Sequence, residues 1–169
     1  LYPIDTSRAK QVSHEVYDRD NKLIRAYLVD DGTLRLKGES NLVDAQYTEM
    51  LLAFEDKRFY DHDGVDWLAL TRAARQRLKN GRVISGGSTI TMQVAKLLEP
   101  KPRTLKAKVI EMFRAKQLEA RFSKSEILSL YFTLAPYGGN LEGVRAASLG
   151  YLGRLPQDLT PDEAALLVA

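Results

Sequence analysis

The chain lacks cysteine altogether, and it has only two histidines, His14 and His62, which lie far apart in the sequence. The missing cysteines exclude disulfides and thiolate metal ligands, and two distant histidines do not favour a zinc site. Long apolar runs are missing too, because no stretch reaches the about 18 residues that a membrane-crossing helix needs. A disulfide scaffold, a zinc protein and a membrane-spanning segment are therefore poor descriptions of this chain.

Neither charge sign is in large excess. With 25 basic and 22 acidic residues, the net charge is +3, which is too small to indicate nucleic-acid binding, so we expect no nucleic-acid partner. The 169 residues, 44% hydrophobic and 28% charged, have the composition of an ordinary folded domain. The sequence starts at Leu1 and stops inside an apolar helical pattern at Ala169, so we expect a piece of a longer polypeptide.

Residues 1–42 differ from the rest of the chain and predict a β-rich linker segment. Short strand-like runs at 16–17, 23–29 and 34–36 are separated by turn-prone residues at 18–21 and 30–32. We expect a β-hairpin or a small meander in this segment.

From residue 43 to residue 169 the pattern becomes helical, and we expect a mainly α domain. Asp, Ser and Thr mark most of the expected starts, since their side chains accept hydrogen bonds from the free N–H groups of a first helical turn. We expect helices at 45–54 after Asp44, 67–79 after Asp66 and closed by Asn80 and Gly81, 90–98 after Ser88 or Thr89, 105–121, 124–134 after Ser123, from Asn140, and from Pro161 after Thr160. In helix 105–121 we expect an inward apolar face made of Leu105, Val109, Met112, Phe113 and Leu118.

The most informative residues are an acidic pair that follows an apolar run. Glu55 and Asp56 follow the apolar residues 50–54, so a carboxylate lies at the border of a hydrophobic surface, where poor solvation favours its use as a base. Residues 86–89, Gly-Gly-Ser-Thr, are typical of a tight turn that opens a helix, whose free N–H groups favour anions. Both patterns also have purely structural interpretations, a helix-end ion pair and a capped turn. Together they indicate group transfer from a phosphorylated donor.

A basic stretch follows these residues. Lys96, Arg103, Lys106 and Lys108 crowd one short segment, which usually means a solvated face. Lys108 and Glu111 lie on one face of the expected helix, which pairs a cation with a second carboxylate. We expect Glu55 and Glu111 to converge on one groove, because two carboxylates at a glycosidic centre are a familiar arrangement.

Taken in order, these patterns resemble the motifs of the peptidoglycan glycosyltransferases of family 51, the lipid II polymerases of class A penicillin-binding proteins. The first motif, Glu-Asp-x-x-Phe-x-x-His-x-Gly, is complete from Glu55 to Gly64. The second appears at 86–93, the third at 107–111 and the fourth at 124–133, and a fifth region at 143–153 also fits. The resemblance covers residues 44–169.

Three positions depart from the family pattern. Met92 replaces a glutamine of the second motif, Ala107 replaces the arginine of the third, and Thr133 replaces the asparagine of the fourth. Losing that arginine and that asparagine is expected to weaken donor binding or helix anchoring, whereas both glutamates are retained. Met92 and residues 135–139 make the chain most similar to the subgroup of penicillin-binding protein 1C.

The resemblance implies a lysozyme-like helical head lobe and a smaller jaw lobe that dips into the membrane, with Val83 and Ile84 as candidate contacts. It also implies an N-terminal transmembrane helix and a C-terminal transpeptidase domain outside this chain. The implied activity is polymerisation of lipid II into β-1,4-linked glycan strands with inversion, at the extracytoplasmic (periplasmic) face of the bacterial inner membrane. The implied partners are lipid II, the growing glycan strand, the membrane surface and other cell-wall synthesis proteins.

Residue roles follow from the same resemblance. Glu55 and Glu111 are the implied catalytic residues, with Glu55 as the general base. Glu111 either orients the basic cluster or holds Mg²⁺ or another divalent metal against a pyrophosphate. The implied substrate-binding set, including residues that support Glu55 from behind, is Asp56, Phe59, His62, Arg72, Ser88, Thr89, Gln93, Lys96, Arg103 and Lys108.

Two other functions stay open. A lysozyme-like lytic enzyme would use Glu55 as an acid on preformed glycan and would not need the basic cluster. A non-catalytic scaffold would bind lipid II without polymerising it.

Overall fold

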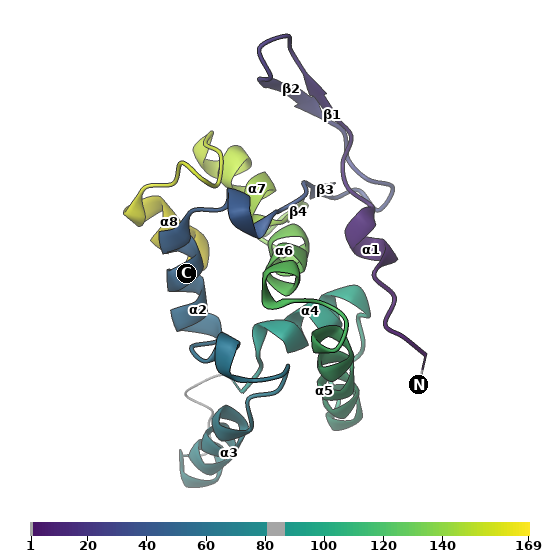
Figure 1. The fold of residues 1–169 in the computed structure, drawn as a ribbon, viewed down its shortest axis with the longest axis vertical. Coiled ribbons are helices and arrows are strands. Elements are labelled where there is room, and N and C mark those ends of the chain that lie inside the picture. The colour runs from purple at the N-terminus through teal and green to yellow at the C-terminus, as the bar shows by residue number, and fades with distance from the viewer. Residues whose placement is uncertain (1, 81–86) are drawn as a thin grey trace.

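The computed structural model describes residues 2–80 and 87–169, apart from the side chains of residues 74 and 77–80. The predictions on Gly81, Val83, Ile84 and Gly86 lie outside the described residues. Figure 1 shows a body of helices from which one β-hairpin projects. The predicted mainly α fold is confirmed.

The helices of the body, apart from α7, begin and end close to the predicted positions. They are α2 (Ala45–Glu55), α3 (Trp67–Asn80), α4 (Ile90–Leu98), α5 (Leu105–Glu119), α6 (Lys124–Leu134), α7 (Val144–Ala147) and α8 (Pro161–Val168). A short 3₁₀ turn at Ser40–Leu42 precedes α2, and a second 3₁₀ turn at Phe59–Asp61 and a π-helical turn at Ser148–Leu152 lie between the later helices.

The predicted helix starts are confirmed by their caps. Asp44 accepts a hydrogen bond from the N–H of Tyr47, and Thr89, rather than Ser88, caps α4. Ser123 and Thr160 form complete capping boxes at α6 and α8. Each cap satisfies N–H groups that a helix cannot satisfy itself, which explains why these boundaries could be predicted.

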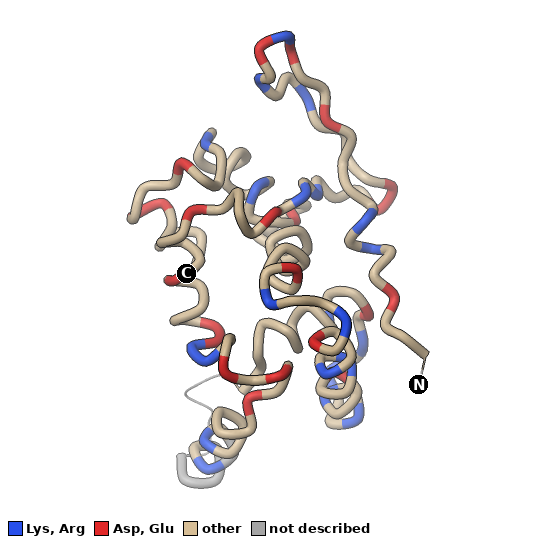
Figure 2. Tube along the Cα trace, in the orientation of Figure 1, with Lys and Arg blue, Asp and Glu red and all other residues tan. Residues whose placement is uncertain are grey.

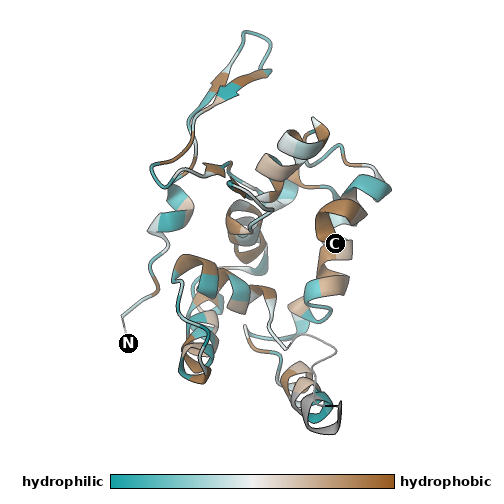
Figure 3. Ribbon diagram, turned by 180° about the vertical axis from the view of Figure 1, so that it is seen from behind, coloured by the Kyte–Doolittle hydropathy of each residue, from teal (hydrophilic) through white to brown (hydrophobic). Residues whose placement is uncertain are grey.

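The core lies where α4 packs against α5 and α6, and where α2 packs against α8. Its fully buried side chains include Tyr47, Ile90, Ile127 and Phe132. Figure 3 shows hydrophobic ribbon where α8 and α2 lie together near the C-terminal end. This packing fixes the end of α2 relative to the start of α4.

The predicted inward face of α5 is wrong for three of its five residues. Leu105, Val109 and Phe113 are 88%, 52% and 57% exposed, whereas Leu118 is buried and Met112 is half-buried. The buried face carries Ala107, Ala115 and Leu118 instead. Small side chains let α5 approach its neighbours closely. The backbone of Ala115 comes so near to Gly64 that a Cβ atom added to this glycine would lie only 2.8 Å from it.

The N-terminal segment contains a short helix, α1 (Ser7–Lys10), and strands β1 (Glu15–Tyr17), β2 (Leu23–Ala26) and β3 (Leu34–Arg35). The predicted hairpin is confirmed, since β1 and β2 pair antiparallel with Glu15 opposite Ala26. A three-stranded meander does not form, because β3 pairs in parallel with β4 (Leu141–Glu142). The helix predicted from Asn140 is wrong, because this strand occupies its start and α7 begins at Val144. The boundary at residue 42 stays a prediction.

Within the described residues, no helix combines the length and apolar character needed to cross a bilayer. In Figure 2 lysine and arginine positions, coloured blue along the backbone tube, gather on α3 and α5 at one end of the helical body.

Candidate active site

Glu55 is the last residue of α2 and stands at the meeting point of several cavities. Its Oε2 atom accepts a hydrogen bond of 2.7 Å from Nε2 of Gln93 on α4. The Glu55 side chain contributes to the walls of three cavities, of about 590, 760 and 580 Å³. A carboxylate held by one amide and open on several sides is well placed to take a proton from a bound molecule.

Asp56, the next residue, anchors this end of α2 to α4. The buried Asp56 carboxylate accepts hydrogen bonds from the N–H of Ile90 at 2.9 Å and from Nε2 of His62 at 3.0 Å. The N–H of Gly64 donates to Nδ1 of His62, so the imidazole proton is on Nε2 and the ring orientation is fixed. Both residues therefore hold Glu55 opposite Gln93.

Lys124 completes this support and was not singled out as a site residue by the sequence. Its Nζ atom donates to the carbonyl of His62 at 2.6 Å and to Glu119 at 2.7 Å. The same atom lies 4.5 Å from the centre of the ring of Phe59, which is buried in the core. Neither Phe59 nor His62 lines any of the three cavities at Glu55. The only available signal for Lys124 was its place at the start of the fourth motif.

The turn before α4 connects the residues that support Glu55 to the basic residues of α5. Thr89 donates to the carbonyl of Gly64 at 2.7 Å while capping α4, so its hydroxyl proton is used by the protein. Ser88 accepts a hydrogen bond of 2.5 Å from Nζ of Lys108, and the same lysine donates to Oε2 of Glu111 at 3.1 Å. Glu111 and Lys108 are thereby oriented across the turn from Glu55.

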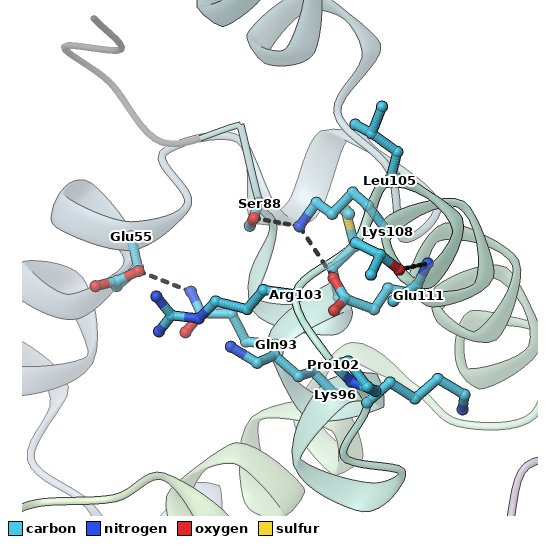
Figure 4. A pocket seen from close by; sticks show the side chains of 13 residues that line it. Glu55, Ser88, Gln93, Lys96, Pro102, Arg103, Leu105, Lys108 and Glu111 are labelled. Atoms are coloured by element: carbon cyan, nitrogen blue, oxygen red, sulfur yellow. Dashed lines mark hydrogen bonds and ion pairs between the residues drawn. The ribbon is translucent and has the colours of Figure 1, made fainter.

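The cavity of about 590 Å³ lies between α4 and α5 and contains both glutamates. Figure 4 shows Lys96, Arg103 and Gln93 extending from one side toward Glu55, with Lys108 and Glu111 on the other. Within the described residues, Lys96 and Arg103 make no hydrogen bond or ion pair, so their charges are available to an anion. The remaining lining residues are Ser88, Met92, Lys101, Pro102, Thr104, Leu105 and Ala107.

The cavity of about 760 Å³ lies on the α3 side of Glu55 and contains Arg72 together with Ser88, Thr89 and Gln93. Its wall includes an ion pair between Arg58 and Asp66, with Nε of Arg58 3.0 Å from Oδ2 of Asp66. Burial alone would raise the pKa of Asp66, but the N–H of Ala69 and the guanidinium of Arg58 lower it below its usual value. Asp66 is therefore a paired structural anion, whereas Arg72 is exposed.

The three residues that depart from the family pattern are all buried. Ala107 is buried at the wall of the basic cavity, and Met92 lies in the core beside Val65 and Ala115. Thr133 accepts a hydrogen bond of 3.0 Å from the N–H of Gly38. A threonine thus ties α6 to the N-terminal segment at Gly38.

A metal site made of protein groups alone does not form in the described part of the chain, which holds no group of three or more His, Cys, Asp or Glu that could bind one. Mg²⁺ commonly takes one or two carboxylates and completes its shell with water and substrate phosphates. Glu111 is the carboxylate inside the basic cavity that fits such a shared site.

The helical body and its cleft define a mainly α domain in which the Glu55 carboxylate shares a cavity with lysine and arginine side chains. The chain belongs to the transglycosylase family, which it matches over residues 22–169. It is 50% identical over 137 residues to penicillin-binding protein 1C of Escherichia coli (strain K12), covering 81% of this chain and 18% of that protein. It is 36% identical over 156 residues to penicillin-binding protein 1A of Aquifex aeolicus (strain VF5), covering 92% of this chain and 21% of the relative. Penicillin-binding protein 1A of Pseudomonas aeruginosa is 38% identical over 160 residues, with 93% and 19% covered. The chain therefore spans about a fifth of the length of these relatives.

Proposed function

We propose that this domain is a peptidoglycan glycosyltransferase that joins lipid II units into β-1,4-linked glycan strands with inversion and release of undecaprenyl pyrophosphate. One observation carries the proposal: Glu55 forms part of the wall between a basic cavity and a second cavity of similar size. A base in that position lies between two substrate-sized spaces, one of which offers the unpaired Lys96 and Arg103 to a leaving diphosphate.

Glu55 acts as the general base in this mechanism. It removes the proton from the 4-hydroxyl of the acceptor sugar while that oxygen attacks carbon 1 of the donor sugar. The new bond between the 4-oxygen and carbon 1 forms as the bond between carbon 1 and the pyrophosphate oxygen breaks, and the single displacement inverts carbon 1. Gln93 holds Oε2 of Glu55, and Oε1 has no partner among the described residues, so one oxygen is free for the proton.

The basic residues of the cavity, Lys96, Arg103 and Lys108, stabilise the leaving group in this mechanism. Negative charge develops on the pyrophosphate as it leaves, and fixed cations in a cleft stabilise such charge without having to reorganise. Lys96 and Arg103 are unpaired within the described residues, whereas Lys108 is oriented by Ser88 and Glu111. We assign Lys96 and Arg103 as direct pyrophosphate ligands and Lys108 as a cation held in place for it. Arg72, Ser88 and Gln93 would contact polar groups of the substrates.

A divalent metal is part of the proposal. Glu111 would hold Mg²⁺ together with pyrophosphate oxygens, and the ion would supply additional positive charge to the leaving group. The ion pair of Glu111 with Lys108 then orients the carboxylate for that purpose.

Two other functions are less well supported. A lytic enzyme acting on preformed glycan has no anionic leaving group, and it would not need Lys96 and Arg103 unpaired beside Glu55. A scaffold that only binds lipid II would not need Glu55 held by Gln93 with one oxygen open.

The place of action belongs to the proposal too. Lipid II is held in the bilayer by its polyprenyl chain, so we place the domain at the membrane surface on the extracytoplasmic side. The exposed apolar residues Leu105, Val109 and Phe113 on α5, together with the basic residues on the same helix, suit a contact with an anionic lipid surface. Other cell-wall synthesis proteins are the partners that we expect there.

The experiment that tests the proposal measures polymerisation of fluorescent lipid II by Glu55→Gln, with Glu49→Gln as the matched control on the exposed face of α2. Loss of the base should lower turnover by at least about 100-fold, while the control keeps wild-type activity. Activity of Glu55→Gln within about tenfold of wild type would remove Glu55 from this role. Runs with Mg²⁺ and with a chelator test the metal, and clearance of purified sacculi without lipid II would support the lytic alternative instead.

A further inference from the structure

The segment between α4 and α5 carries one of the two unpaired cations, although it has no regular secondary structure. It covers residues 99–104, referred to as the connecting loop, and it contains Arg103, whereas Lys96 belongs to the last turn of α4. Figure 4 shows both side chains extending toward Glu55. Charge stabilises a transition state best when it is already in position, so the loop has to be held in place before the reaction.

The two ends of the connecting loop are fixed by ordinary helix signals. The N–H of Glu99 donates to the last turn of α4 at 3.0 Å, and Thr104 caps the start of α5. Pro100 and Pro102 each restrict one backbone dihedral between these ends. These restraints do not explain what holds the loop against the side of α5.

The carboxylate of Glu99 makes that connection. Its Oε2 atom accepts a hydrogen bond of 3.1 Å from Nε of Arg114 on α5 and one of 2.7 Å from Nζ of Lys101 in the loop itself. Glu99 is not among the residues that line the cavity of about 590 Å³, and its side chain is only 20% exposed. It therefore lies behind the loop and not in contact with a ligand of the cavity.

Arg114, the partner of Glu99, is itself held in place. Its Nη1 atom donates to the carbonyl of Tyr2 at 2.6 Å and to Oε1 of Gln117 at 2.7 Å. On the other side of the loop, Arg8 donates at 2.8 Å to the carbonyl of Leu97, which the end of α4 leaves without a helical partner. The N-terminal segment thus supports the loop from both sides.

The charge of Glu99 makes its location informative. Burial alone would raise the pKa of its carboxyl group, but the hydrogen bond from Lys101 and the charge of Arg114 lower it below its usual value, so the group is ionised at neutral pH. A negative charge close to an anion site opposes binding there. A carboxylate at this position therefore needs another reason to be present.

We propose that Glu99 is a positioning residue of the diphosphate site, which clamps the connecting loop to Arg114 on α5 and thereby keeps Arg103 directed toward the leaving group. The inference rests on the proposed glycosyltransferase function, which assigns Lys96 and Arg103 to the pyrophosphate. Glu99 acts through Arg103 and touches no substrate. Its contact with α5 favours diphosphate binding, whereas its charge opposes it, so the two effects differ in sign.

The test measures the affinity of inorganic pyrophosphate by calorimetric titration in the presence of a chelator. Glu99→Gln keeps the size of the side chain but removes its charge. We expect about three- to tenfold weaker binding, because the ligand then has to order Arg103 itself. A carboxylate that acted only through its charge would give the opposite result, since its removal would strengthen binding. Glu163→Gln, which breaks a similar ion pair with Nε of Arg154 at 3.0 Å outside the cavity, is the matched control and should bind as wild type does.

A double variant separates the contact from the net charge. Glu99→Gln combined with Arg114→Met has the net charge of wild type but lacks the clamp. Its affinity should stay about as low as that of Glu99→Gln, because both changes remove the same contact and their effects do not add. Recovery of wild-type affinity in the double variant would show that net charge alone decides binding.

Other results would overturn the proposal as well. Unchanged or tighter binding in Glu99→Gln would do so, as would a wild-type protein that does not bind pyrophosphate. If Glu99→Gln does not fold, Glu99→Asp, which keeps the charge but shortens the side chain, replaces it; wild-type affinity in that variant would then refute the clamp. The titration contains no lipid II, so the clamp can fail while wild-type polymerisation stands. A wild type that does not polymerise lipid II would refute the proposed function and leave the comparison of pyrophosphate affinities intact.

Discussion

At the scale of single residues, the cleft contains two kinds of cation: those that form ion pairs with protein carboxylates and those that do not. Lys101 is paired with Glu99 at 2.7 Å and Lys108 with Glu111, whereas Lys96 and Arg103 are unpaired in the described part of the chain. An unpaired cation keeps its full charge for a ligand, so these two residues should matter most to the leaving group.

This difference gives a prediction for turnover. Lys96→Ala and Arg103→Ala should each cost about 2–4 kcal/mol of transition-state stabilisation, because each removes fixed charge from the leaving diphosphate. Kinetics of lipid II polymerisation measure this loss. Lys106→Ala, an exposed residue that does not line the cavity, is the control and should leave kcat/KM unchanged. Unchanged kinetics in both site variants would contradict the leaving-group assignment.

The candidate site residues could be named from the sequence, but most of their contacts could not. Motif spacing brought Glu55, Lys108 and Glu111 together as candidates, and the structure places all three in one cavity. The bond between Gln93 and Glu55 depends on how α2 meets α4, which no local pattern encodes.

At the scale of helices, α5 shows where hydrophobic periodicity misleads. Leu105, Val109 and Phe113 recur at helical spacing and predict a buried stripe, yet they face solvent. The buried face uses Ala107 and Ala115, which carry little hydrophobic signal but permit close packing. An apolar stripe on the outside of a helix indicates a surface that is covered by something else.

We expect lipid to cover the exposed apolar stripe of α5. Changing Leu105, Val109 and Phe113 together to serine should weaken binding to phosphatidylglycerol-containing vesicles by at least about tenfold, since each buried apolar side chain contributes about 1.5–3 kcal/mol. Vesicle sedimentation measures the change.

The matched control for this triple variant lies on the hairpin and just after it. Val16, Ile24 and Leu28 are also exposed and apolar, but they lie outside α5. Their change to serine should leave vesicle binding unaltered. Equal losses in the two triple variants would show that general hydrophobicity, rather than the α5 surface, drives binding.

At the scale of the whole molecule, the segment before residue 43 is joined to the helical body by long-range contacts. Arg35, whose side chain is fully buried, donates to Glu142 at 2.6 Å, to the carbonyl of Gln11 at 2.8 Å and to Asp31 at 2.8 Å. The sequence predicted the hairpin from its turn, which is a local signal. It could not predict that β3 pairs with β4, because the partner strand is distant in the chain.

The carboxylates around Arg35 make this contact between the N-terminal segment and the helical body sensitive to acid. The hydroxyl of Thr33 and the guanidinium of Arg35 lower the pKa of Asp31 from 3.8 to about 2. A carboxylate whose pKa is lowered by folding stabilises the protein above its unfolded-state pKa, and that stabilisation is lost as the pH falls toward the folded value. Asp31 should therefore contribute fully at pH 6 and no longer below about pH 2.

Urea unfolding of Asp31→Asn between pH 6 and pH 2 tests this linkage. At pH 6 the variant should be less stable than wild type by at most about 1 kcal/mol, because the Asp31 side chain is 46% exposed and solvent screens its charge. The difference should shrink as the pH falls below 4 and be small at pH 2, since about half of wild-type Asp31 is then neutral as well. Asp30→Asn, which removes the neighbouring exposed carboxylate, is the control and should show no such convergence. A stability difference that stays constant down to pH 2 would mean that Asp31 acts through its shape and hydrogen bonds rather than through its charge.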